Sequence, residues 1–176
     1  MVKKLFDKKL NFEINVIGYK NKGESIVFFL KADGKAIYAG LIDCYEEASE
    51  NIALKLLEGE RVNYFNFVCW THPHDDHTIG LDKVLINFCD ENTKFYMPPF
   101  VLGDVEGYSS NAQNVYRKLF AVLESRKRNK MKIREASDAQ ILEKFECCGN
   151  ASIYPYIFEI RSFAPDTMLL GKLKVK

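Results

Sequence analysis

All three histidines of the 176-residue chain lie within six consecutive positions, as His72, His74 and His77. The preceding residues 63–70 are rich in aromatic and β-branched side chains, which predicts a buried strand. Side chains alternate along an extended chain, so His72 and His74 are expected to point the same way. Pro73 between them keeps this stretch out of a helix. The cluster therefore predicts a strand that ends in a metal-binding turn.

The turn is expected to lead into a helix, which would place Asp76 and His77 side by side. Two imidazoles can hold one metal ion, and a carboxylate with a third imidazole can hold another. Two such ions orient and activate a water molecule. Imidazole and carboxylate ligands favour zinc, with manganese or iron as alternatives. Asp75 is interpreted as a turn-capping carboxylate that does not bind metal.

Asp43 is a further candidate, because it follows the predicted strand at residues 36–42 and precedes a predicted helix. One interpretation is a carboxylate that stabilises the N-terminus of that helix. The other is a hydrogen-bond partner that fixes the geometry of the metal-binding loop. The sequence favours neither.

Composition excludes some classes of partner. The chain is 47% apolar and 28% charged, which is typical of a globular domain. Its 25 basic and 24 acidic residues give no global field that would draw it to nucleic acid or to a membrane surface, although this balance still allows a local basic patch. The five cysteines form no C-x-x-C pair, and no apolar run approaches the length of a membrane span. A reduced, cytoplasmic protein without a membrane partner is expected.

The hydrophobic pattern predicts an α/β arrangement with a mixed sheet. The first predicted strand, residues 10–17, carries Leu10, Phe12, Ile14 and Val16 on one face. Asp33-Gly34 predicts a tight hairpin between the next two strands. The remaining predicted strands are residues 25–31, 36–42, 63–70, 94–97 and 152–163, and the predicted helices are residues 46–58, 81–88 and 111–127.

The run Thr71-His72-Pro73-His74-Asp75-Asp76-His77 matches the T/S-H-x-H-x-D-H signature of the metallo-β-lactamase superfamily. Within it, the chain resembles the soluble relatives of the hydrolase domain of ComEC-type competence (DNA-uptake) proteins. Gly23-Glu24-Ser25 carries part of the narrower likeness, at a position where relatives usually have G-D-S. Leu41-Ile42-Asp43 and Thr78-Ile79-Gly80-Leu81 carry the rest, together with the late strand ending Ser162-Phe163-Ala164-Pro165. The resemblance implies an αβ/βα sandwich with mixed sheets, of which this chain would hold the N-terminal portion.

The resemblance also implies roles for the residues of the motif. His72 and His74 would bind one divalent ion, and Asp76 and His77 would bind the other. Asp76 would also be catalytic, because it helps to orient the attacking water. Asp43 would be the buried aspartate that supports the site. His74 stands where oxygen-reducing diiron members typically have a glutamate, which indicates hydrolysis rather than redox chemistry.

The superfamily completes its site with a bridging aspartate and at least one later histidine. This chain has no other histidine, and Asp104, Glu106 and Asp166 are only weak substitutes. We therefore interpret residues 1–176 as a single metallo-β-lactamase-like domain truncated at its C-terminus. On that interpretation this fragment alone is expected to be inactive and to bind metal weakly or not at all. It is also expected to form a homo-oligomer, to swap elements, or to associate with a partner through exposed core surface.

The function expected from these observations is metal-dependent hydrolysis of a phosphodiester, either a nucleotide or a nucleic acid. Residues 125–132 hold five positive charges, which fit either a solvated helix end or a strip that contacts phosphates. The alternatives are hydrolysis of a carboxylic ester, thioester or lactam, and a catalytically inactive binding module, because a fold does not fix a substrate.

Overall fold

The protein is described by a computed structural model that covers residues 3–6, 9–98, 107–125, 130–148 and 156–163. Its larger sheet has the strand order β2-β3-β4-β5-β6-β7. The pairs β2–β3 and β3–β4 are antiparallel, and all pairs from β4 to β7 are parallel. This mixed sheet, together with the helices, confirms the predicted α/β class. The strands are β2 (Leu10–Gly18), β3 (Glu24–Ala32), β4 (Lys35–Ile42), β5 (Phe67–Cys69), β6 (Lys94–Met97) and β7 (Lys132–Glu135).

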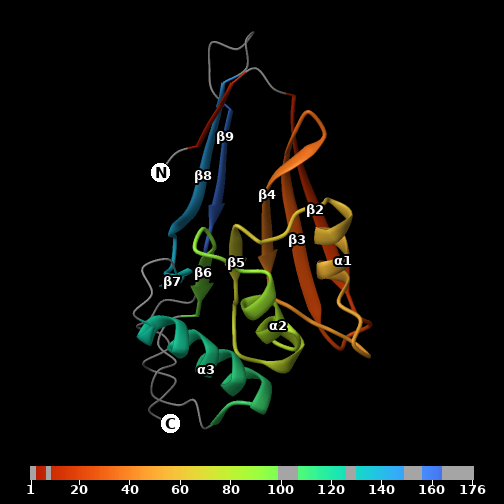
Figure 1. Ribbon diagram of the computed structural model, residues 1–176, viewed down its shortest axis with the longest axis vertical. Helices are drawn as coiled ribbons and strands as arrows, with labels where there is room; N and C mark the ends of the chain where they lie inside the picture. Colours follow the sequence, from red (N-terminus) through yellow and green to blue (C-terminus); the bar gives the residue numbers. More distant parts are fainter. Residues whose placement is uncertain (1–2, 7–8, 99–106, 126–129, 149–155, 164–176) are drawn as a thin grey trace.

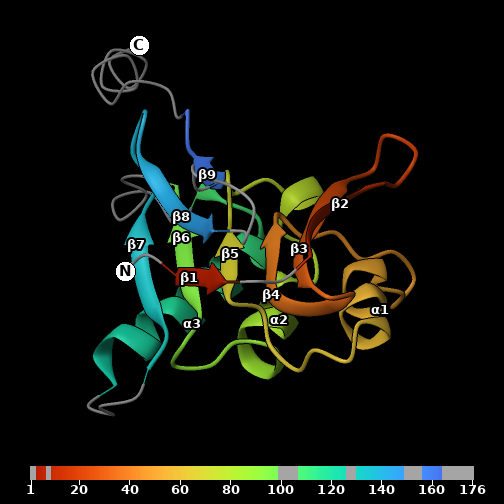
Figure 2. The ribbon, with the colours of Figure 1, turned by 90° about the horizontal axis from the view of Figure 1, so that it is seen from above.

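A second, three-stranded sheet has the order β1-β8-β9 and packs on one face of the larger sheet (Figures 1 and 2). It consists of β1 (Lys3–Phe6), β8 (Ile141–Cys148) and β9 (Tyr156–Arg161). The helices α1 (Ile52–Gly59), α2 (Leu81–Asn87) and α3 (Ser110–Glu124) cover the opposite face. Figure 2 shows these three helices in the lower half of the view, with β8 and β9 above them. The large sheet is therefore the middle layer of three.

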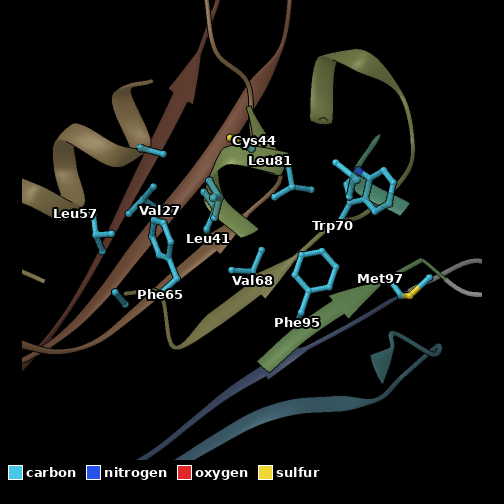
Figure 3. Close-up of a cluster of buried hydrophobic side chains, with 14 of the residues drawn as sticks. Val27, Leu41, Cys44, Leu57, Phe65, Val68, Trp70, Leu81, Phe95 and Met97 are labelled. Atoms are coloured by element: carbon cyan, nitrogen blue, oxygen red, sulfur yellow. The ribbon is translucent and has the colours of Figure 1, made fainter. Parts of the chain in front are cut away.

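Each face of the large sheet has its own hydrophobic core, because side chains alternate along the strands. On the helix side, Val27, Leu41, Val68 and Phe95 are fully buried between the strands and the helices (Figure 3). On the other side, Phe28 and Tyr38 pack with Phe145 of β8, and Phe12 of β2 stacks on Phe158 of β9. Burial on both faces explains why the central strand β5 is apolar throughout.

The parallel pairing of β4 with β5 places the candidate site. Ile42 lies opposite Cys69, so both strands end at the same edge of the sheet. Asp43 follows directly, and its backbone N–H donates to the Cys69 carbonyl oxygen over 2.8 Å. Ligand sites in sheets of this kind form at the carboxyl ends of parallel strands.

Local turn signals were predicted well, but one helix begins later than expected. Asp33 and Gly34 have φ values of 52° and 78°, as the predicted hairpin requires. The helix predicted over residues 46–58 starts only at Ile52. Ala48 and Ser49 have positive φ values of 51° and 65°, which a right-handed helix does not allow. The Asn51 side chain caps the new start by accepting from the Leu54 N–H.

Other differences arise from tertiary packing. The strand predicted over residues 63–70 is regular only from Phe67 to Cys69, and β1, β7 and β8 were not predicted. Residues 126–127 and 152–155 of two predicted elements lie outside the described residues. On β2, the alternating face is partly buried at Phe12, which stacks on Phe158 of the second sheet, whereas Ile14 and Val16 are 58% and 74% exposed. Among the described helices, none is both long and apolar enough to cross a membrane.

Candidate metal centre

The histidine loop leaves β5 in an extended conformation and then folds into a single 3₁₀ turn, η1 (Asp75–His77). The turn is closed by the His77 N–H, which donates to the His74 carbonyl oxygen over 3.1 Å. The Thr78 hydroxyl also donates to that carbonyl oxygen over 2.6 Å, and accepts from the buried Trp70 Nε1–H over 3.0 Å. Both contacts hold the loop backbone in place, so the backbone positions from which the histidine side chains extend are fixed.

Asp43 is the centre of the hydrogen bonds that hold this loop. Its carboxylate accepts from the Thr71 N–H over 2.7 Å, the Thr71 hydroxyl over 2.7 Å, and His77 Nδ1 over 2.8 Å. The side chain is only 6% exposed. Burial raises the pKa of Asp43, and the hydrogen bonds from Thr71 and His77 act in the opposite direction. These contacts match the interpretation of Asp43 as a hydrogen-bond partner of the loop, and its role at a metal site stays a prediction.

These bonds determine which ring nitrogens remain available. A carboxylate can only accept, so His77 Nδ1 donates to Asp43, and in a neutral imidazole with this bond the lone pair lies on Nε2. The Thr71 hydroxyl donates its single proton to Asp43. Its oxygen, 3.0 Å from His72 Nδ1, can therefore only accept a hydrogen bond from that ring. His72 is therefore also protonated on Nδ1 and presents Nε2. A carboxylate that orients imidazoles in this way is the usual support of a metal-binding histidine.

Three ligand-type side chains converge in front of this support. One donor atom from each of His72, Asp76 and His77 lies within 4.8 Å of the other two. The His72 and His77 ring centroids are 3.9 Å apart, and His77 Nε2 is 3.4 Å from Asp76 Oδ2. Burial, followed by the nearby His77, lowers the pKa of His72. That shift favours the neutral imidazole, which is the form that binds metal.

His74 and Asp75 occupy different surroundings. The exposed His74 ring stands edge-on to His72, with centroids 4.8 Å apart, and is not part of the three-residue group. The expected pairing of His72 with His74 stays a prediction, although the structure brings His72 closer to His77. Asp75 faces away from the histidines and accepts from the Ser109 hydroxyl and from Asn111 Nδ2. It thus joins the loop to the first turn of α3, where Ser109 is the N-cap.

Sequence reasoning missed two contributors to the site. Thr71 was recognised only as part of the motif, although its position directly after a strand could have indicated that it supports the neighbouring ligand. Glu24 was noted only as part of the Gly23-Glu24-Ser25 likeness. Its Oε1 lies 3.9 Å from His77 Nδ1, and it forms a second group of potential ligands with Asp43 and His77. The weak substitutes Asp104, Glu106 and Asp166 lie outside the described residues.

Comparison of the sequence with protein-family models and with curated proteins gives no match. Among solved structures, the chain is similar to one described as "Crystal Structure of a New Diphosphatase from the PhnP Family", with 14% sequence identity and a TM-score of 0.36. The similarity covers 78% of this chain and 49% of that chain. This chain therefore spans about half the length of the structure that it matches.

Replacing Trp70 by phenylalanine should destabilise the loop frame without removing a ligand. The change deletes a buried N–H donor to Thr78 and leaves space beside Tyr116, whose ring centroid is 4.8 Å away. We expect the free energy of unfolding to fall by about 2 kcal/mol, measured by urea denaturation with circular dichroism. Tyr64→Phe, at an aromatic residue that is 46% exposed, is the control and should change little. Equal stability of Trp70→Phe and the parent protein would contradict this role for Trp70.

Proposed function

We propose that this chain is a metal-dependent hydrolase of the metallo-β-lactamase type. The observation that carries the proposal is the convergence of His72, Asp76 and His77 on one point in front of the buried Asp43. Two imidazoles and one carboxylate fit a zinc ion, which in catalytic sites takes three protein ligands and keeps one position open. The hydrogen bonds with Thr71 and Asp43 favour, at both imidazoles, the tautomer that ligation through Nε2 needs.

When bound, the metal would act as a Lewis acid and lower the pKa of a water molecule. The rest of the chemistry falls to side chains of this chain. His72 and His77 would each offer Nε2 to the ion. Asp43 holds the His77 ring directly and the His72 ring through the Thr71 hydroxyl. The Asp76 side chain is 51% exposed, so its carboxylate is open to solvent and can accept a hydrogen bond from the attacking water. Orientation of the nucleophile and fixed charge are the contributions expected of these residues.

We further propose a second ion, for which the exposed His74 beside His72 supplies a ligand. A phosphodiester, in a nucleotide or a nucleic acid, is the proposed substrate, since paired ions stabilise both the attacking and leaving oxygens of a displacement at phosphorus. The resemblance of the histidine run and of Gly23-Glu24-Ser25 to ComEC-type relatives supports this choice. Hydrolysis of a carboxylic ester, thioester or lactam is the alternative within the same chemistry.

Zinc titration of the metal-free protein tests the proposal. We expect a first equivalent to bind through His72, Asp76 and His77, so His77→Gln should weaken its affinity by about a hundredfold or more. His74→Gln is the matched control: it makes the same change in the same loop and should retain the first equivalent while losing the second. Affinity can be measured by competition with a chromophoric chelator, and stoichiometry by elemental analysis. Unchanged binding in His77→Gln would overturn the proposed site, and equal losses in both variants would overturn the division between the two ions.

A further inference from the structure

The segment that leads into β3 makes an unusually close approach to the histidine loop. A Cβ atom added to Gly23 would lie 2.2 Å from Cγ and Cδ2 of Tyr45 and 2.8 Å from the Asp76 carbonyl oxygen. No side chain fits at such distances without moving the Tyr45 ring or the loop backbone. Gly18, which lies opposite Glu24 in the β2–β3 pairing, has no atom within 4 Å of the same added Cβ. The restriction is therefore local to Gly23.

The same segment also holds the turn that carries Asp43. Ser25 is fully buried, and its hydroxyl oxygen accepts from the Tyr45 N–H over 2.8 Å. On the other side of this turn, the Cys44 N–H donates to the His77 carbonyl oxygen over 3.1 Å. Asp43 itself has a positive φ of 54°, a conformation that a non-glycine residue keeps only when its neighbours hold it. Residues 43–45 are thus held between Ser25 and the histidine loop.

We propose that Gly23 and Ser25 are positioning residues of the metal centre. Gly23 lets the start of β3 lie directly against the Asp76 backbone, which sets how far the Asp76 carboxylate stands from the two imidazoles. Ser25 fixes the turn from which Asp43 reaches Thr71 and His77. The inference rests on the proposed metal site and extends it. It states that the close packing of residues 23–25 against the loop helps to place the proposed ligands.

Gly23→Ala is the direct test, with Gly18→Ala as the matched control. A methyl group at position 23 must displace the Asp76 carbonyl oxygen, so we expect zinc affinity to fall at least about tenfold, as for other changes behind a metal ligand. Gly18→Ala should bind zinc within about twofold of the parent protein, since its methyl group meets no neighbour. Equal affinity of Gly23→Ala and Gly18→Ala would overturn the inference.

A second set of variants separates the contact with Asp76 from the contact with the Tyr45 ring. The same set tests the inference if Gly23→Ala does not fold. Tyr45→Ala removes the ring, and the double variant Gly23→Ala with Tyr45→Ala then keeps only the clash with the Asp76 carbonyl oxygen. We expect the double variant to bind zinc about tenfold more weakly than Tyr45→Ala. Equal affinities would show that the Asp76 contact does not position the site.

The metal-free protein gives an independent readout. In Gly23→Ala, or in the double variant compared with Tyr45→Ala, the backbone amide resonances of Asp76 and His77 should move, whereas Gly18→Ala should leave them in place. If the parent protein binds no zinc, the proposed function fails, but these resonances still test the packing. Resonances that do not move would overturn the positioning role itself.

Discussion

Replacing Asp76 by asparagine is expected to slow hydrolysis about a thousandfold or more in an active form of the protein, while the fold stays intact. The change removes a proposed metal ligand and the carboxylate proposed to orient the water, and a thousandfold loss corresponds to a barrier increase of about 4 kcal/mol. The half-exposed Asp76 side chain makes no packing contribution that would explain such a loss. Turnover of bis-nitrophenyl phosphate with added zinc or manganese is the assay, and thermal unfolding verifies the fold.

Asp75→Asn is the control for this prediction, because it removes the same charge from the adjacent residue. An alanine would be less suitable, since Asp75 accepts hydrogen bonds from Ser109 and Asn111 at the start of α3. Asparagine keeps an oxygen that can accept both. We expect Asp75→Asn to retain most of the activity. Equal rates for the two variants would refute the role of Asp76, and with it the assignment of this loop as the catalytic centre.

Asp43→Ala is expected to cost about 3 kcal/mol of stability, the loss typical when one partner of a buried charged network is removed. The variant leaves the Thr71 N–H, the Thr71 hydroxyl and His77 Nδ1 without their acceptor. It should also weaken zinc binding by about ten- to a hundredfold, because His77 loses its partner and Thr71, which contacts His72, loses its acceptor. Urea denaturation and zinc competition measure the two effects. A variant that kept parental zinc affinity would contradict the supporting role of Asp43.

Asp43→Asn adds a pH-dependent control in the metal-free protein. Burial raises the pKa of Asp43, so the folded state keeps this proton to higher pH than the unfolded chain does. Between about pH 4, the ordinary value, and the raised pKa, folding takes up a proton, and the stability contributed by this group falls as the pH rises. Asparagine has no proton to exchange. The stability of Asp43→Asn relative to the parent protein should therefore improve as the pH rises through that range.

The parts of the fold that depend on nearby residues were predictable from the sequence. The Asp33-Gly34 hairpin follows from two residues that tolerate positive φ, and the α3 pattern follows from a 3.6-residue period. The clustering of three histidines and Asp76 behind a strand identified the candidate site, since a strand followed by a tight turn brings nearby side chains together whatever the rest of the chain does.

The arrangement within the site depended on tertiary structure. Asp43 is 28 residues from Thr71 and 34 from His77, and they meet only because β4 and β5 pair in parallel with Ile42 opposite Cys69. The same pairing brings Asp43 to the Thr71 and His77 contacts that orient the neighbouring rings. Likewise, nothing near Gly23 in the sequence indicates that it touches Asp76. The hydrophobic period of an element indicates which of its sides is buried. Which residues pack against that side depends on strand order and register, and these are set by contacts between residues far apart in the sequence.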